Sequence, residues 1–274
     1  MEQQILQEVV AAFSELPFIK GIALGGSRAT GTASLDSDID IGLYYNHEEL
    51  DYDALNEKAR QLDDHHRFNL IGKEGDWGQW VNFGGWLKMH GIAVDLIFRD
   101  IKRIGYIMDE THAGIYSNNY HAGHPHAYLS CMYRGELALS KLLYAADPSF
   151  SDLKTLAQHY PEKLQSSLIQ YYLFEADFSL MLAKKAKSSE DLYYLSGILF
   201  RAISSLNQVV YAKNKIYLIN EKKALLQIDR FEFAPVNYRD RVNAIFETMH
   251  LESHHPIQLL ESLLADVQDL IIKQ

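Results

Sequence analysis

The sequence of 274 residues predicts an α+β fold in two parts, a mixed-sheet N-terminal domain over residues 1–125 and an all-helical bundle over residues 126–274. Two observations predict it. Short apolar runs typical of strands occur in the first part, and long stretches of helical periodicity replace them from about residue 126. The prolines at positions 148, 161, 235 and 256 fall between these stretches, where a proline would end a helix.

The N-terminal part is predicted to mix helices and strands. An opening amphipathic helix places Ile5, Val9 and Phe13 on one face. Two apolar runs joined at His90-Gly91 predict a hairpin. In order, the expected elements are a helix over 2–14, a strand over 18–24, a turn over 25–37 with a helix start just after Ser27, a strand over 38–45, a helix over 52–62, strands over 80–89 and 92–98, and a helix over 100–108.

The C-terminal part is predicted to be helical throughout. The segment 121–126, rich in His, Gly and Pro, is the expected junction between the two parts. The expected helices cover 127–145, 151–159, 162–187, 190–213, 220–230, 238–250 and 257–273. These helices or the opening helix could bury a dimer face, so the sequence leaves a homodimer open.

Composition restricts the class of partner. A formal net charge of −10 argues against a nucleic-acid partner, because such binding depends mainly on Lys and Arg at phosphates. No apolar run has the length of a membrane span, and the first residues show no basic stretch followed by an apolar one, so neither a membrane segment nor a signal peptide is expected. Cys131 is the only cysteine, which excludes an internal disulfide and fits a cytoplasmic protein.

Three aspartates carry the predicted chemistry. Asp38 and Asp40 lie two residues apart on one expected strand, so their side chains point to the same face. Asp95 interrupts a second apolar strand, where an acid is costly unless it is paired or bound to a cation. Each acid alone could be a solvated or paired residue. Together they would form a hard oxygen site of the kind that Mg²⁺ prefers, and two such ions about 4 Å apart would support phosphoryl or nucleotidyl transfer.

A small-residue turn precedes the first two acids. Gly25 and Gly26 would let the backbone approach a phosphate closely, Ser27 could donate a hydroxyl, and Arg28 could add positive charge. The turn is neither a Walker A loop nor a dinucleotide fingerprint, since no Lys follows the second glycine and G-x-G-x-x-G is absent. Alone, a Gly-Gly-Ser sequence is most often only a turn. Its place before the acids favours a role in binding a triphosphate.

The pattern of Gly-Gly-Ser, a gap, Asp38-x-Asp40 and a later strand with Asp95 resembles the nucleotidyltransferase superfamily of the DNA polymerase β type. Within it, the chain is similar to the aminoglycoside nucleotidyltransferases, the kanamycin enzymes in particular. The resemblance covers about the first 100 residues well and the helical part loosely. It implies an N-terminal nucleotidyltransferase domain in which Asp38 and Asp40 hold two Mg²⁺ ions and Asp95 holds one.

The resemblance also implies roles for the remaining site residues. Ser27 would contact the β- or γ-phosphate, Gly25 and Gly26 would admit the triphosphate, and Arg28 is included in this nucleotide-binding set. Glu175, in the context Leu-Phe-Glu, matches the general base of the kanamycin enzymes. The lysine that follows one turn later in that family is Ser179 here, which puts the substrate and the nucleotide contacts in question.

Without the resemblance, Glu175 has two interpretations. It could be a base buried beside Tyr171, Phe174 and Phe178, or an acid at the solvated edge of a core helix. Asp177 is the fallback candidate for the base.

The function expected from the sequence is a metal-dependent transfer of a nucleoside monophosphate from an NTP, with ATP as the first candidate, to a hydroxyl of a small acceptor, with release of pyrophosphate. An aminoglycoside-like acceptor is the one that the family resemblance implies. The alternative is a non-catalytic nucleotide-binding module or a regulatory module of the toxin–antitoxin type. All three acidic positions are filled, which argues against a degenerate relative. The helical part, residues 126–274, contains no R-x4-6-H motif of helical RNase toxins, which argues against a toxin.

Two further clusters have open interpretations. His121, His124 and His126 have spacing that could bind a transition metal, although a turn at the junction is favoured and His124 could instead line an acceptor pocket. Trp77, Trp80, Phe83 and Trp86 precede the third acid. They could stack on a nucleobase or a ring substrate, but packing against the sheet is the favoured interpretation.

Overall fold

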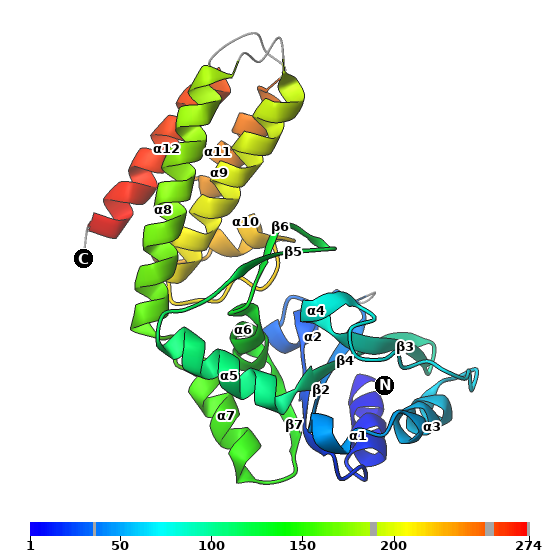
Figure 1. Cartoon of the computed structure of the whole chain (residues 1–274). Coiled ribbons are helices and arrows are strands. Elements are labelled where there is room, and N and C mark those ends of the chain that lie inside the picture. Colours follow the sequence, from blue (N-terminus) through cyan, green and yellow to red (C-terminus); the bar gives the residue numbers. More distant parts are fainter. Residues whose placement is uncertain (35–36, 187–190, 250–254, 273–274) are drawn as a thin grey trace. The chain divides into compact units, whose positions relative to one another are not determined.

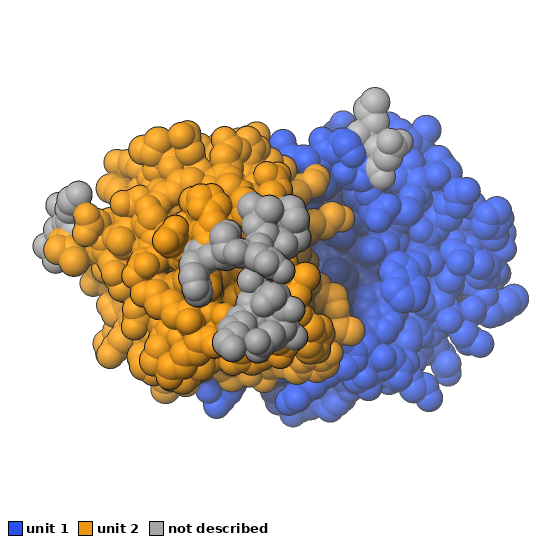
Figure 2. All heavy atoms as spheres, turned by 90° about the horizontal axis from the view of Figure 1, so that it is seen from above, with its two compact units in different colours: residues 1–111, 130–159 blue, residues 112–129, 160–274 orange. Residues whose placement is uncertain are grey.

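The computed structural model describes residues 1–34, 37–186, 191–249 and 255–272. The chain forms two compact units, shown in different colours in Figure 2. Unit 1 comprises residues 1–111 and 130–159, and unit 2 comprises residues 112–129 and 160–274. The single domain boundary expected near residue 125 stays a prediction. The two compact units are interleaved in sequence, because residues 112–129 belong to unit 2 and residues 130–159 belong to unit 1.

Unit 1 is built on a five-stranded sheet with the strand order β3-β4-β2-β1-β7 (Figure 1). Strands β2 and β4 pair in parallel, and the other neighbours are antiparallel. The strands are β1 (Ile19–Leu24), β2 (Ile39–Tyr45), β3 (Phe83–Met89), β4 (Ile92–Asp100) and β7 (Lys141–Ala145). The helices are α1 (Glu2–Phe13), α2 (Gly26–Thr30), α3 (Tyr52–Leu62), α4 (Gly78–Val81), α5 (Ile101–His112), α6 (Met132–Leu139) and α7 (Pro148–Gln158), with a 3-10 turn at His47–Glu49.

The side chains on one face of this sheet form the main core of unit 1. Helices α1 and α3 cover it, with Ile5, Val9 and Phe13 of α1 fully buried as their spacing predicts (Figure 1). The inward residues of β2 alternate, so Ile41 and Leu43 are also fully buried. The opposite face is covered at one end by α7, whose Phe150 ring packs on the bare backbone of Gly21 and beside Tyr44.

The predicted helix over 127–145 is wrong. The chain continues as a strand to Leu129, forms the short helix α6, and then adds β7 to the sheet beside β1. The apolar sequence of 141–145 suits a helix or a strand equally well on periodicity alone. Pairing with the open edge of β1 decides in favour of a strand, because it satisfies the backbone groups of both segments.

Unit 2 consists mainly of helices. Its two long helices, α8 (Glu162–Lys185) and α9 (Leu192–Lys213), pack against each other along their lengths. The remaining elements are α10 (Ala224–Ile228), α11 (Tyr238–Glu247), α12 (His255–Ile272) and a two-stranded hairpin of β5 (Asn118–His121) and β6 (His124–Leu129). The expected junction at 121–126 is therefore the turn of this hairpin, and strands do not vanish at residue 126.

The α+β class predicted from the sequence is confirmed, with a mixed sheet in the N-terminal part and helices dominating the C-terminal part. The helices ending at residues 185, 213, 247 and 272 follow the predicted ranges closely. Among the described residues, no helix has both the length and the apolar character needed to cross a membrane.

Candidate active site

Two of the three predicted acids lie side by side on the sheet of unit 1. Asp40 of β2 and Asp95 of β4 are register partners in the parallel pair. Neighbouring strands lie about 4.8 Å apart, so the two side chains leave the same face from adjacent positions. Both are partly buried, and the residues that flank them in sequence (Ile39, Ile41, Val94 and Leu96) are fully buried in the core on the other face.

Asp38 directly precedes β2 and is exposed. Burial, together with the charges of Asp40 and Asp38, raises the pKa of Asp95 to about 6. The structure thus brings Asp38 and Asp40 within electrostatic reach of Asp95. Carboxylates arranged in this way favour a proton or a cation that reduces their mutual repulsion.

The donor set of these acids suits a divalent metal ion. It consists of carboxylate oxygens alone, which is the ligand chemistry that Mg²⁺ takes. Among the residues that the structure describes, no group of three His, Cys, Asp or Glu side chains is drawn together closely enough to enclose a metal ion. An open set of this kind fits an ion that completes its coordination with substrate phosphates and water rather than a closed structural site.

The Gly25-Gly26 turn packs directly against Asp40. The Gly25 amide donates a hydrogen bond to the Asp40 carbonyl oxygen at 2.8 Å. Gly26 has φ +58°, and a Cβ atom there would lie 1.8 Å from Asp40 Oδ2. Position 26 therefore requires glycine for two reasons, its left-handed backbone and its contact with the carboxylate. The turn and the acid are thus in direct contact, although Gly26 and Asp40 are 14 residues apart in the sequence.

Arg28 and Ser27 belong to α2, immediately after this turn. The Arg28 guanidinium donates to the carbonyl oxygens of Ser37 and Asp38 and pairs with Glu2 at 2.6 Å. Arg28 thus anchors the backbone that leads into Asp38. Its expected contact with a phosphate, like that of Ser27, stays a prediction.

A cation that the sequence analysis missed lies beside the turn. Lys141 of β7 is the register partner of Leu24, the last residue of β1, and its Nζ donates to the Arg28 carbonyl oxygen at 3.2 Å. The side chain is exposed. No signal in the sequence marked it, because residues 127–145 were expected to be helical and only the pairing of β7 with β1 brings Lys141 to the turn.

The predicted base, Glu175, lies in unit 2. It is on α8 and forms an ion pair with Arg201 of α9. Its side chain is 12% exposed. The pair lines a cavity of about 160 Å³ together with side chains from the β5–β6 hairpin and α8, namely Asn118, Asn119, Tyr120, His126, Ala127, Tyr171 and Tyr172.

The apolar neighbours expected around Glu175 are not buried. Tyr171, Phe174 and Phe178 are 41%, 66% and 44% exposed. The buried face of α8 instead includes Tyr172, Ala176 and Leu180, which explains why helical spacing alone misassigned the core face. Glu175 is thus only 12% exposed although these three rings are open to solvent, and its ion pair with Arg201 lies in the cavity beside the hairpin.

The histidine segment forms part of this site without a metal cluster among the described residues. Burial lowers the pKa of His126, and the positive charge of Arg201 lowers it further. The backbone of His126 donates to Glu221 Oε1 at 3.0 Å, and Glu221 Oε2 lies 3.6 Å from His124 Nδ1. Glu221 therefore ties the hairpin to the helices of unit 2, and His126 lines the cavity.

Comparison with known proteins supports the assignment of unit 1. Residues 3–112 match the nucleotidyltransferase domain family, and the matched segment includes Gly25, Gly26 and all three acids. No curated protein matches the chain at a significant level.

The chain is similar to several solved structures at low identity. A nucleotidyltransferase-like protein from Exiguobacterium sibiricum shares 9% identity, with a TM-score of 0.45 over 99% of this chain and 75% of that chain. Spectinomycin adenyltransferase AAD(9) from Enterococcus faecialis, solved with ATP and spectinomycin, shares 12% identity, with a TM-score of 0.38 over 97% of this chain and 99% of that chain. A CdnC:HORMA-deltaN complex from E. coli gives 13% identity and a TM-score of 0.26, over 97% and 88% of the two chains.

The resemblance predicted from Gly25-Gly26-Ser27 and the three aspartates is confirmed by the family match. The match identifies a nucleotidyltransferase domain at residues 3–112.

Proposed function

We propose that the protein transfers a nucleoside monophosphate from an NTP, with ATP as the first candidate, to a hydroxyl group of a small acceptor. The acceptor oxygen forms a bond to the α-phosphorus, the bond from that phosphorus to the bridging oxygen breaks, and pyrophosphate leaves with the electron pair. The observation that carries the proposal is the arrangement of Gly26, Asp40 and Asp95: a turn position that only glycine can occupy packs on the Asp40 carboxylate, and Asp40 is the register partner of Asp95.

Asp38, Asp40 and Asp95 would hold the divalent ions, of which two Mg²⁺ are proposed. Bound Mg²⁺ neutralises charge on the reacting phosphates and lowers the pKa of the attacking group. The residues of the chain act around this chemistry. Gly26 lets the turn pack directly on the Asp40 carboxylate, and Gly25 and Gly26 would bind the phosphate chain through their backbone, while Arg28 holds the segment that presents Asp38. Lys141 adds a positive charge beside the turn, where its Nζ bonds to the Arg28 carbonyl oxygen.

Labelled ATP with a panel of small hydroxylated acceptors, aminoglycosides among them, tests the reaction. We expect Mg²⁺-dependent release of pyrophosphate and a labelled acceptor, both abolished by a chelator. Asp40→Asn should lower the rate at least ~100-fold, since it removes a ligand of the proposed metal site. Asp109→Asn, which removes an exposed acid of α5, is the matched control and should keep full activity. Binding of Mg²⁺ and ATP without turnover on the whole panel would favour the non-catalytic alternative.

Glu175 is proposed as the base that takes the proton of the acceptor hydroxyl. Its ion pair with Arg201 fixes the carboxylate in the cavity of unit 2. Glu175→Gln should lower kcat by ~100-fold or more, the usual range for a general base. Asp177 is an exposed acid on the same helix and the fallback candidate for the base. Asp177→Asn is therefore the comparison variant. A larger loss in Asp177→Asn than in Glu175→Gln would transfer the role to Asp177.

We propose a cytoplasmic setting and a nucleotide with a small molecule as the partners. The support for this setting is that the single cysteine, Cys131, is buried and has no second cysteine in the chain with which to form a disulfide. A homodimer stays a prediction. One face of α8 carries Tyr171, Phe174, Phe178 and Met181, each at least 39% exposed, and sedimentation in solution would show whether a second copy covers it.

A further inference from the structure

Trp86 of β3 belongs to the same row as the acids. It is the register partner of Asp95 in the antiparallel β3–β4 pair, and Asp95 is in turn the partner of Asp40. Directly opposite residues on paired strands project from the same face of a sheet. The row therefore runs from Trp86 through Asp95 and Asp40 to Gly25, which bonds to the Asp40 backbone at the end of β1.

The Trp86 ring is largely open to solvent although it has a stacking partner. Its exposed fraction is 61%, the highest among the tryptophans, whereas Trp80 is 8% exposed. Trp77 stacks on it with the ring centroids 4.6 Å apart and an interplanar angle of 23°. Trp77 itself lies over Gly84, where a Cβ atom would be 2.3 Å from its ring. Packing against the sheet thus accounts for Trp77 and Trp80 but leaves most of Trp86 uncovered.

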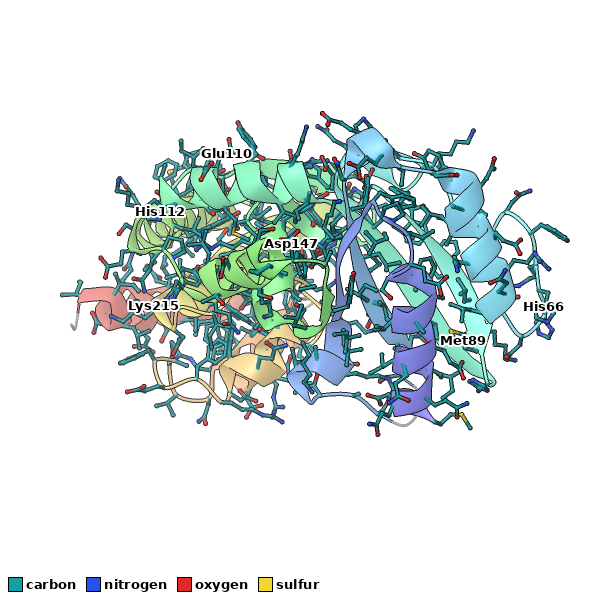
Figure 3. The ribbon with its side chains drawn as sticks, turned by 90° about the horizontal axis from the view of Figure 1, so that it is seen from below. His66, Met89, Glu110, His112, Asp147 and Lys215 are labelled. Carbon is teal, nitrogen blue, oxygen red and sulfur yellow. The ribbon has the colours of Figure 1, made fainter. Side chains whose placement is uncertain are left out.

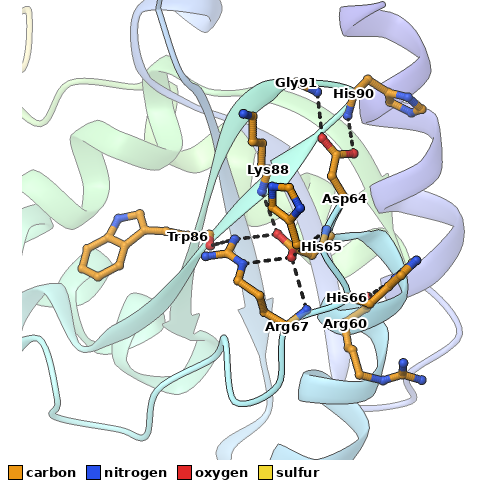
Figure 4. A network of polar contacts seen from close by, with 10 residues as sticks. Arg60, Asp64, His65, His66, Arg67, Trp86, Lys88, His90 and Gly91 are labelled. Atoms are coloured by element: carbon orange, nitrogen blue, oxygen red, sulfur yellow. Dashed lines mark hydrogen bonds and ion pairs between the residues drawn. The ribbon is translucent and has the colours of Figure 1, made fainter.

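The backbone that presents Trp86 is held from behind by a charged pair. Arg67 Nη2 donates to the Trp86 carbonyl oxygen at 3.1 Å, and the same guanidinium binds Asp63 through two nitrogens (Figure 4). Asp63 also accepts the Lys88 amide at 3.0 Å. In Figure 4 the Trp86 ring projects away from this network. Arg67 therefore holds the backbone of Trp86 in place, and the indole ring stays exposed to solvent.

We propose that Trp86 forms a ring-binding wall of the acceptor subsite and determines acceptor specificity. The inference rests on the proposed function. In an in-line displacement the acceptor approaches the α-phosphorus from the side opposite the leaving pyrophosphate. With the phosphate chain at the Gly25-Gly26 turn and the acids in the middle of the row, Trp86 stands on the far side. At a strand spacing of ~4.8 Å it lies about 10 Å from Asp40 across the sheet, roughly the width of a small ring compound.

The occupant is a compound whose ring presents an apolar face, since an exposed indole offers a planar apolar face and one N–H donor. The C–H face of a saturated sugar or cyclitol ring and the π face of an aromatic ring share this property, and an open-chain polyol lacks it. Trp86 is a specificity residue in this assignment and takes no part in the bond changes.

Saturation-transfer NMR on the full chain tests the assignment with three probes: 2-deoxystreptamine as an aliphatic ring, tyramine as an aromatic ring, and sorbitol as an open-chain polyol. We expect at least one ring probe to bind the wild type and sorbitol to give no signal. Trp86→Ala should weaken ring binding at least about fivefold, and Trp86→Phe should restore most of it, because aromatic stacking tolerates a change of ring. Phe68→Ala, which removes another exposed ring of unit 1, is the matched control and should bind as the wild type does.

Calorimetry with Mg²⁺ and ATP separates this inference from the proposed function. Trp86→Ala should bind ATP as tightly as the wild type, while Asp40→Asn should not. Absence of ATP binding in the wild type would sink the proposed function but leave ring binding measurable. Absence of ring binding in the wild type, or equal binding in Trp86→Ala, would overturn the assignment of Trp86. A loss of ATP affinity in Trp86→Ala would overturn it as well, since the indole would then contact the nucleotide.

Discussion

A single backbone position joins the two halves of the site in unit 1. Gly26 adopts φ +58° and leaves no room for a Cβ atom beside Asp40 Oδ2. Gly31, at the end of the same short helix, also has a left-handed φ of +73° but has open space around it. A side chain at either glycine would strain the backbone, but only one at Gly26 would also displace the Asp40 carboxylate. Comparing the two positions therefore separates these effects.

We expect Gly26→Ala to abolish nucleotidyl transfer, with a loss of at least ~100-fold, and Gly31→Ala to keep it. Both variants should lose about 1 kcal/mol of unfolding free energy from the left-handed backbone, and Gly26→Ala should lose more because Asp40 must move. Urea unfolding and pyrophosphate release measure the two quantities. Equal activity of the two variants would show that the turn does not position Asp40.

Asp95 makes the stability of the ligand-free protein depend on pH. Its pKa rises from the ordinary 3.8 to about 6 through burial and the neighbouring charges of Asp40 and Asp38. Between these values the folded state holds a proton that the unfolded state has released, so the contribution of Asp95 to stability is present below about pH 4 and is lost as the pH rises through about 6.

Asp95→Asn should therefore raise the unfolding temperature near neutral pH and leave it unchanged below about pH 4. Mg²⁺ competes with the proton at this carboxyl, so it should stabilise the wild type more at neutral pH than at acidic pH, and the variant less than the wild type at neutral pH. Thermal unfolding across pH, with and without Mg²⁺, measures both effects. Asp109→Asn supplies the reference, and a wild type that Mg²⁺ does not stabilise would contradict the metal site.

At the scale of an element, the β3–β4 hairpin is fastened to the loop after α3. Asp63 is fully buried and accepts hydrogen bonds from Arg67 and from the amides of His65 and Lys88. The Asp64 amide donates to the Lys88 carbonyl at 2.7 Å, so the loop with His66 and the end of β3 at Met89 lie at one edge of unit 1 (Figure 3). The Arg67 guanidinium lowers the pKa of Asp63 well below its ordinary value, and the amide donors lower it further.

Asp63→Asn should destabilise the protein by roughly 2–4 kcal/mol, because it removes the charge from a buried acceptor and leaves Arg67 without its partner. Asp64→Asn, at an exposed acid that accepts the amides of His90 and Gly91, should cost less. Since the pKa of Asp63 is lowered by folding, its contribution is present above about pH 4 and is lost as the pH falls, the opposite sign to that of Asp95. Denaturant unfolding at neutral and acidic pH measures the difference, and equal losses in the two variants would contradict the role of the buried pair.

At the scale of the whole molecule, unit 1 depends on residues beyond the expected domain boundary. β7 covers the edge of β1, Phe150 packs on Gly21, and the buried Arg134 donates to the carbonyl oxygens of Met108, Leu156 and His159. A chain cut after residue 125 would lose all of these contacts and expose the backbone groups of β1.

We expect a fragment of residues 1–159 to unfold cooperatively, and a fragment of residues 1–125 to be less stable or to aggregate. The longer fragment keeps the complete five-stranded sheet, whereas the shorter one lacks its edge strand and α7. Circular dichroism during heating, with light scattering, compares the two. Equal stability would support the boundary predicted from the sequence.

The sequence by itself determined the local pattern of the site. Strand alternation is a property of a few consecutive residues, so it correctly predicted that Asp40 points away from the core that holds Ile39 and Ile41. Helical periodicity within each segment likewise predicted the extents of α1, α3, α8 and α9, although not which face of α8 is buried. The recognition of the nucleotidyltransferase domain depended on this local pattern and on the order of the three acids.

Only the tertiary structure decided which segments became neighbours. Residues 141–145, predicted as a helix, form an edge strand, and this strand places Lys141 beside the turn. Arg28 binds the backbone before β2, and Trp86 is exposed in register with Asp95. The physical reason is that strand pairing and the covering of a face depend on backbone groups and side chains far away in the sequence. Periodicity in a short window contains no information about those partners.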